Sequence, residues 1–189
     1  MIKALIFDCF GVVLTDALKV LAEKLSATDP AKADQMLDIM KASMHGIILS
    51  GEADQRRAAL LGMNVEQYRI NIRQGEVKDQ ALLDYIGELH QTYKTAMLSN
   101  VSSGGLARRF KAGELEQYFD VIVASSEIGF AKPEPEAYET VAERLGVRLE
   151  DCLMIDDREL YCDGARAVGM QALLYTDLTN FKKAFAALR

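Results

Sequence analysis

Four short apolar runs in this chain end in polar residues, and this feature limits the possible folds more than any other. The runs stop at Asp8, at Ser99-Asn100, at Ser125-Ser126 and at Asp156-Asp157. In a parallel α/β sheet, the carboxyl ends of the strands lie along one edge, and ligands bind in the crevice there. If the runs are such strands, carboxylate, hydroxyl and amide groups from distant parts of the sequence converge on one site. The pattern therefore predicts an enzyme.

After residue 78, helical and extended patterns alternate to the end of the chain. Apolar residues recur at helical spacing in four segments, residues 81–90, 135–145, 160–168 and 181–188, and residues 171–175 form a last extended run. A further helix is expected after Ser102 or Ser103, where Leu106 and Phe110 lie one turn apart. This alternation predicts an α/β fold with a Rossmann-like three-layer α/β/α core and a mostly parallel sheet.

The segment between the first run and residue 79 has a different character. Leu18, Leu21 and Leu25 recur at helical spacing, further helical patterns follow, and no convincing strand pattern interrupts them. We therefore expect residues 15–78 to form a small helical cap inserted after the first strand. Residues 1–14 and 79–189 then form the Rossmann-like core.

Composition excludes several classes of protein. A net charge of -6 without a long basic stripe argues against a nucleic-acid partner, although a local site for a small phosphorylated metabolite can still be positive. No apolar stretch reaches the ~18 residues of a membrane span. Three cysteines without metal-ligand spacing, together with an N-terminus unlike a signal peptide, indicate a cytoplasmic protein. The sequence does not indicate an oligomeric state.

The acidic residues at the strand ends suit chemistry on phosphate. A carboxylate such as Asp8 at the end of a central strand can attack phosphorus and form an acyl phosphate. That attack needs a divalent cation to offset the negative charges, and Mg²⁺ prefers oxygen ligands, which Asp8, Asp156 and Asp157 would supply. Adjacent acids repel each other, so a bound cation is the simplest reason for the pair at 156–157.

Each of three other polar residues can be interpreted either as part of a phosphate site or as an ordinary structural residue. Ser99 and Asn100 are expected to donate hydrogen bonds to phosphate oxygens, and Lys132 to balance the developing negative charge. The plain alternatives are that Ser99-Asn100 caps the following turn and that Lys132 is a solvated loop residue. Arg56 and Arg57 could reach a substrate phosphate, but we expect both on a solvated helix face.

Four motifs in this order give the chain a family resemblance. They are Ile6-Phe7-Asp8-Cys9-Phe10-Gly11-Val12, Leu98-Ser99-Asn100, Lys132-Pro133-Glu134-Pro135-Glu136-Ala137-Tyr138 and Ile155-Asp156-Asp157. With them the chain resembles the haloacid dehalogenase superfamily, most of whose members are magnesium-dependent phosphatases. The sequence at residues 125–129 is similar to that of the branch that contains epoxide-hydrolase N-terminal phosphatase domains and sugar-phosphate phosphatases.

The resemblance implies a role for each matching residue. Asp8 would be the catalytic nucleophile and a ligand of Mg²⁺. Further metal ligands would be the backbone carbonyl of Phe10 and the side chains of Asp156 and Asp157.

The remaining motif residues would bind substrate. Ser99 and Asn100 would bind the transferring phosphoryl group, and Lys132 would orient both the nucleophile and the phosphate. The activity implied is Mg²⁺-dependent hydrolysis of a small phosphate monoester through an aspartyl-phosphate at Asp8.

Two positions depart from the family pattern. Phe10 stands where most of these phosphatases have a second aspartate as general acid and base, whose loss typically costs about 10²–10⁴-fold in rate. Tyr161 stands where Asn or Asp is common and weakens the expected support of the metal. We therefore expect a slow or specialised enzyme.

Two alternatives follow from these departures. A 2-haloacid dehalogenase would have an aromatic residue at the position of Phe10, but such enzymes do not typically keep the acidic pair Asp156-Asp157. A catalytically degenerate member that binds a phosphorylated ligand or a protein partner is the other alternative.

Overall fold

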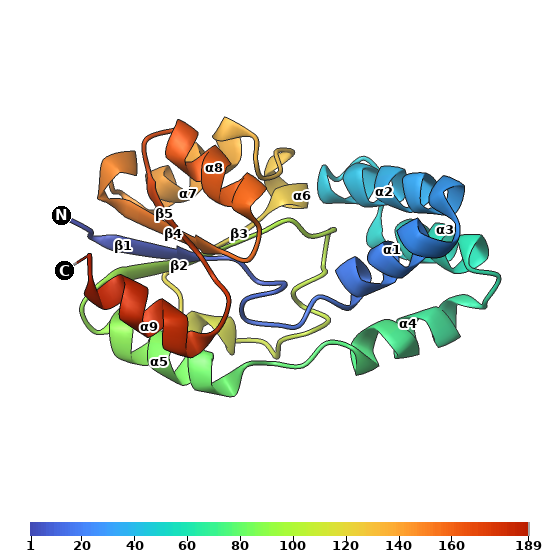
Figure 1. The fold of residues 1–189 in the computed structure, drawn as a ribbon, viewed down its shortest axis with the longest axis horizontal. Coiled ribbons are helices and arrows are strands. Elements are labelled where there is room, and N and C mark those ends of the chain that lie inside the picture. The colour runs from blue at the N-terminus through green and yellow to red at the C-terminus, as the bar shows by residue number, and fades with distance from the viewer. Residues whose placement is uncertain (189) are drawn as a thin grey trace.

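The computed structural model describes residues 1–188, and within them the strands form one parallel five-stranded sheet of order β3-β2-β1-β4-β5 (Figure 1). The strands are β1 (Ala4–Phe7), β2 (Lys94–Ser99), β3 (Val121–Ala124), β4 (Cys152–Asp156) and β5 (Gln171–Leu174). Each neighbouring pair is parallel. β1 therefore lies at the centre, with β2 and β4 on either side.

Successive side chains of β1 point to opposite faces of the sheet. Leu5 and Phe7 pack on one face against α5 (Gln80–His90) and α9 (Leu178–Ala186). Ala4 and Ile6 pack on the other face against α7 (Pro135–Leu145) and α8 (Glu159–Ala167). Figure 1 shows these two helix pairs on opposite sides of the sheet. The predicted Rossmann-like three-layer α/β/α architecture is confirmed.

Local sequence signals fix the ends of these helices. The Asp79 carboxylate accepts a hydrogen bond from the Leu82 amide and so caps the start of α5. Pro135 occupies the first turn of α7, where its missing N–H has no cost. Gly146 ends α7 in the left-handed conformation that glycine adopts without strain.

Residues between β1 and α5 form the helices α1 (Ala17–Thr28), α2 (Pro30–Met44), α3 (Ser50–Leu60) and α4 (Val65–Gln74). They lie beyond the carboxyl edge of the sheet (Figure 1), where α1, α2 and the end of α3 pack around a small core of Leu25, Ala33 and Met36. The two connections to this group run side by side, because the Thr15 amide donates to the Val77 carbonyl. That residues 15–78 form a separate cap stays a prediction.

One expected helix does not form. Residues 103–109 are a succession of turns instead of the helix predicted after Ser102 or Ser103. Gly104 has φ of +66°, and a Cβ on Gly105 would lie 2.3 Å from the Val101 side chain. The two glycines therefore fold the chain back tightly against Val101, which a regular helix would not allow.

Short helical elements complete the described chain. α6 (Ser125–Ile128) directly follows β3, and the 3₁₀ turns η1 (Leu115–Gln117) and η2 (Leu149–Asp151) precede β3 and β4. Among residues 1–188, no helix combines the length and the apolar sequence needed to cross a lipid bilayer.

Candidate active site

The polar ends of the three central strands meet at the carboxyl edge of the sheet. Asp8 directly follows β1, Ser99 is the last residue of the neighbouring β2, and Asp156 is the last residue of β4. One carboxylate oxygen each of Asp8, Asp156 and Asp157 lies within 4.8 Å of the others. Register explains this, because Phe7 pairs with Ile155 and places the following residues side by side.

Lys132 joins two of these carboxylates. Its Nζ donates to Asp8 Oδ1 at 2.7 Å and to Asp156 Oδ2 at 2.6 Å, and its side chain is fully buried. Asn100 fixes the backbone of Lys132 from both sides: its Nδ2 donates to the Lys132 carbonyl and its Oδ1 accepts from the Lys132 amide, each at 2.8 Å. Asn100 therefore positions the lysine, and its predicted contact with a phosphate stays a prediction.

Burial and charge oppose each other in this cluster. Burial raises the pKa of Asp8 to about 7, although the neighbouring Lys132 ammonium acts to lower it. For Lys132, burial alone would lower the pKa, but the carboxylates of Asp156 and Asp8 hold it above its ordinary value. Lys132 is therefore a permanent cation beside Asp8.

Two buried oxygens at the ends of β2 and β4 have no hydrogen-bond partner within residues 1–188. They are Ser99 Oγ and Asp157 Oδ1. An unpartnered buried polar atom is costly, and in native proteins it usually marks the place of an ion, a ligand or a water. A phosphoryl oxygen suits the Ser99 hydroxyl, and a divalent cation suits the Asp157 carboxylate with its acidic neighbours. The residues present therefore fit both groups.

Lys19, on α1, is a residue of this site that the sequence analysis missed. Its Nζ donates to Asp157 Oδ2 at 2.6 Å. Asp157 is thereby oriented by a residue from outside the core, while its other oxygen stays unpaired. Lys19 is one polar residue on an amphipathic helix, and the sequence has no signal that distinguishes it from a solvated lysine.

The turn after Asp8 brings Phe10 and Gly11 to the site. The Phe10 ring lies against the Arg109 guanidinium, whose Cζ is 4.9 Å from the ring centre. Gly11 has φ of +96°, and a Cβ there would lie 2.4 Å from Asp157 Cγ. The Phe10 side chain carries no group that can transfer a proton, and its backbone carbonyl remains a predicted metal ligand.

Tyr161 takes a structural position beside the lysine. Its ring centre is 5.1 Å from Lys132 Nζ and 4.5 Å from Arg158 Cζ, while Arg158 Nη1 donates to the Tyr161 hydroxyl at 2.9 Å. Cations over an aromatic face are attracted to its electrons. Tyr161 therefore supports two cations of the site.

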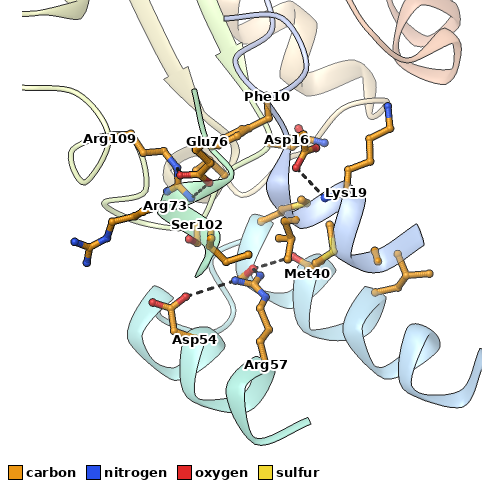
Figure 2. A pocket seen from close by; sticks show the side chains of 18 of the residues that line it. Phe10, Asp16, Lys19, Met40, Asp54, Arg57, Arg73, Glu76, Ser102 and Arg109 are labelled. Carbon is orange, nitrogen blue, oxygen red and sulfur yellow. Dashed lines mark hydrogen bonds and ion pairs between the residues drawn. The ribbon is translucent and has the colours of Figure 1, made fainter. Parts of the chain in front are cut away.

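A cavity of about 320 Å³ lies between this edge and helices α1–α4. Asp8, Phe10 and Asn100 line it from the sheet side, and Met40 and Arg57 line it from α2 and α3. Figure 2 shows Arg57 pointing into the space with Phe10 across from it. Arg57 is 6% exposed, so the expectation of a solvated helix face was wrong for this residue.

The sequence model of the haloacid dehalogenase-like hydrolase family matches residues 2–169. The chain belongs to this family. The family resemblance drawn from the motifs is thereby confirmed.

Curated relatives match this chain in part. Phosphatase MT3486 of Mycobacterium tuberculosis is 42% identical over 82 residues, which are 43% of this chain and 38% of that protein. Fructose-1-phosphate phosphatase YqaB of Escherichia coli is 36% identical over 59 residues, 31% of each chain. The chain thus aligns with roughly a third of the length of these relatives.

Solved structures share the whole fold of this chain. The HAD family enzyme bt-2542 of Bacteroides thetaiotaomicron superposes with a TM-score of 0.78 at 22% identity, covering 97% of this chain and 98% of that one. L-2-haloacid dehalogenase of Xanthobacter autotrophicus superposes with a TM-score of 0.64 at 17% identity, covering 99% of this chain and 83% of that one. At these identities, the similarity shows the fold alone.

Proposed function

We propose that this hydrolase cleaves the phosphate monoester of a small phosphorylated sugar or related metabolite, with Asp8 as the nucleophile. The observation that carries the proposal is the buried Asp8 carboxylate, held by Lys132 and grouped with Asp156 and Asp157. The unpartnered Ser99 hydroxyl beside it supports a phosphoryl site. Relatives named as phosphatases, one of them for fructose 1-phosphate, agree with the substrate class.

Two displacements at phosphorus complete the proposed reaction. A carboxylate oxygen of Asp8 attacks the phosphorus, the ester P–O bond breaks, and the alcohol leaves as an alkoxide that takes a proton from water. Water then attacks the phosphorus of the acyl phosphate, the bond to Asp8 breaks, and phosphate and the free carboxylate remain. Lys132 and the Ser99 hydroxyl stabilise the charge on the phosphoryl oxygens in both steps.

Asp8, Asp156, Asp157 and the Phe10 carbonyl would hold Mg²⁺, which when bound offsets the negative charges of carboxylate and phosphate. Residues 15–78 would act as a cap that shields the site from water and selects the substrate. Phe10 offers no proton to the leaving alcohol, so esters with good leaving groups should react faster, by about 10²–10⁴-fold over alkyl esters.

Phosphate release from sugar phosphates and a series of aryl phosphates, with Mg²⁺ or with chelator, tests the proposal. Asp8→Asn should lower kcat by on the order of 10³-fold or more. Asp163→Asn is the matched control, because Asp163 is an exposed acid on α8 that pairs with Arg166. Halide release from a 2-haloacid without Mg²⁺, and no phosphate release, would instead assign the dehalogenase activity. No turnover of either class would assign a binding role.

A further inference from the structure

The side of the cavity formed by α3 carries one acid, Asp54, and one buried arginine, Arg57. Arg57 lies there with a side chain only 7% exposed. Its Nη2 donates to Ser43 Oγ at 2.8 Å, and its Nε has no hydrogen-bond partner within residues 1–188. A guanidinium has five N–H donors, and buried donors are normally satisfied. The Tyr68 hydroxyl on α4 is a further hydrogen-bond partner of Arg57, so its donors are partly satisfied and Nε is the atom left without a partner in the described chain.

The nearest carboxylate forms an ion pair with Arg57 but no hydrogen bond. Asp54 Oδ1 is 3.8 Å from Arg57 Nη1, which is too long for a hydrogen bond. The other oxygen of Asp54 accepts from Arg69 Nε at 3.0 Å, so two arginines share this one carboxylate. Figure 2 shows Arg57 between Asp54 and Met40, with its guanidinium facing the cavity.

Another arginine of the cavity, Arg109, is hydrogen-bonded to a carboxylate through two of its nitrogens. Arg109 binds both oxygens of Glu76, from Nε and from Nη2, in the parallel arrangement that suits guanidinium and carboxylate. Arg108 also lines the cavity, but its contacts are with the Ser50 hydroxyl and the Ser103 carbonyl. Arg57 and Arg108 thus face the same space without a hydrogen-bonded carboxylate in the described chain.

We propose that Arg57, assisted by Arg108, binds a second anionic group of the substrate, so that the substrate is a phosphate ester carrying a carboxylate or a second phosphate. This inference rests on the proposed function, because it assumes that the first phosphate lies at Asp8. The cavity volume of about 320 Å³ is at the lower end of the range for small-molecule sites. Arginine is well suited to such groups because its planar fork binds two oxygens at once.

A rival explanation is that Arg57 only ties α3 to α2 through Ser43. A structural tie would affect all ligands equally, whereas an anion site would distinguish ligands that differ in one charged group. Two matched pairs make this comparison: fructose 1-phosphate with fructose 1,6-bisphosphate, and glucose 6-phosphate with 6-phosphogluconate. In the first pair, the second compound has an additional phosphate. In the second pair, C1 of the sugar is oxidised to a carboxylate, which also opens the ring.

Calorimetric binding to the Asp8→Asn protein measures these pairs without turnover. We expect the doubly anionic member of at least one pair to bind about 10- to 100-fold more tightly, as a charge-assisted hydrogen bond of arginine predicts. Whichever pair shows the preference identifies the second group as phosphate or carboxylate. This readout stands even if the wild-type protein hydrolyses none of the four compounds, which would sink only the proposed function.

Arg57→Met keeps much of the side-chain volume and removes the charge. It should abolish the preference within the pair, and in the active protein it should lower the ratio of kcat/KM values by the same factor. Arg56→Met is the matched control, because Arg56 is the adjacent residue, is 54% exposed and pairs with Glu52. The control should keep the full preference.

Arg108→Met gives a second route if Arg57→Met does not fold, because Arg108 is exposed at the cavity. It should reduce the preference by a smaller factor, on the order of 3-fold, in line with an exposed charge. Equal binding within both pairs would overturn the proposal. So would a preference that persists undiminished in Arg57→Met, or, where that variant does not fold, in Arg108→Met.

Discussion

At Gly11 the backbone adopts φ of +96°, and the space that a Cβ would occupy holds the Asp157 carboxylate. Both facts require glycine, but for different reasons. The first is a conformational cost for any L residue, and the second is a direct collision with a proposed metal ligand. Gly129 separates the two effects, because it has φ of +79° and no atom near its missing Cβ.

Gly129→Ala should lower the free energy of unfolding by about 1–2 kcal/mol through backbone strain alone. Gly11→Ala should cost about 1–3 kcal/mol more, because a methyl group 2.4 Å from Asp157 Cγ must displace that side chain. Urea unfolding of both variants measures the difference. Equal losses would show that Asp157 moves aside without cost and is not held in place.

The sequence could predict some site residues and not others. Asp8, Ser99 and Asp156 follow apolar runs, so the rule for parallel strands already places them at one edge. Arg56 and Arg57 are adjacent residues of the same type, and only the packing of α3 makes one exposed and the other buried. A difference set by neighbouring helices is absent from the local sequence.

Among helices and strands too, some can be predicted from the local sequence and others depend on packing. β1, and β4 as far as Ile155, consist of apolar residues because helices cover both faces of the sheet, and such continuous apolar runs can be recognised in the sequence. The segment with Leu106 and Phe110 also has helical spacing, yet it folds as turns. There the backbone of Gly104 and the close approach of Gly105 to Val101 override the apolar pattern.

The end of α2 is joined to the loop before α7 by His45. Its Nδ1 contacts the Lys41 carbonyl at 2.8 Å and its Nε2 contacts Glu134 Oε2 at 2.9 Å. Both partners are acceptors, so only the protonated ring can donate to both. The pKa of His45 is raised by the Lys41 carbonyl and by Glu134, and that of Glu134 is lowered by the Ala131 amide and by His45.

Because of these pKa shifts, the contribution of the His45–Glu134 pair to stability depends on pH. The His45 contribution to stability is complete below its ordinary pKa of 6.5 and is lost as pH rises through the raised value. The Glu134 contribution is present above its ordinary pKa of 4.5 and is lost as pH falls through the lowered value. The pair should therefore stabilise the protein most between about pH 4.5 and 6.5.

Glu134→Gln should lower the free energy of unfolding within this window by no more than about 1 kcal/mol, because both side chains are partly exposed. The loss should shrink as pH rises towards 8.5. Unfolding of the variant and of Glu136→Gln, an exposed acid in the same helix turn, across this range provides the comparison. A loss independent of pH would show that the charge of His45 plays no part.

Across the whole molecule, charge is distributed unevenly. The chain has a net charge of -6, yet the cavity at the carboxyl edge of the sheet is lined by Lys19 and by arginines that include Arg57 and Arg108. Net charge argues against nucleic acid as a class of partner but does not describe the site. That local field arises only when α1, α3 and the loop after β2 are brought together, which composition does not reveal.

Three carboxylates held together at one edge also link the stability of the whole molecule to Mg²⁺. A ligand that binds only the folded state stabilises it by about 2.7 kcal/mol at a concentration 100 times its Kd. For a chain of this length, that corresponds to a rise in Tm of about 5–10 °C. Asp8, Asp156 and Asp157 are the proposed ligands, so Mg²⁺ should raise the Tm and chelator should reverse the effect.

Asp157→Asn should remove most of this Mg²⁺-dependent rise in Tm, because the substitution takes away a charge that faces the proposed site. Asp163→Asn, which removes an exposed charge on α8, should keep it. Thermal unfolding against Mg²⁺ concentration measures both variants and yields the affinity that Tyr161, in place of the usual Asn or Asp, is expected to weaken. An equal rise in both variants would mean that Mg²⁺ acts on the surface charge of the protein and not at the strand ends. Such a result would leave Asp8 and Lys132 without the cation that the proposed chemistry requires.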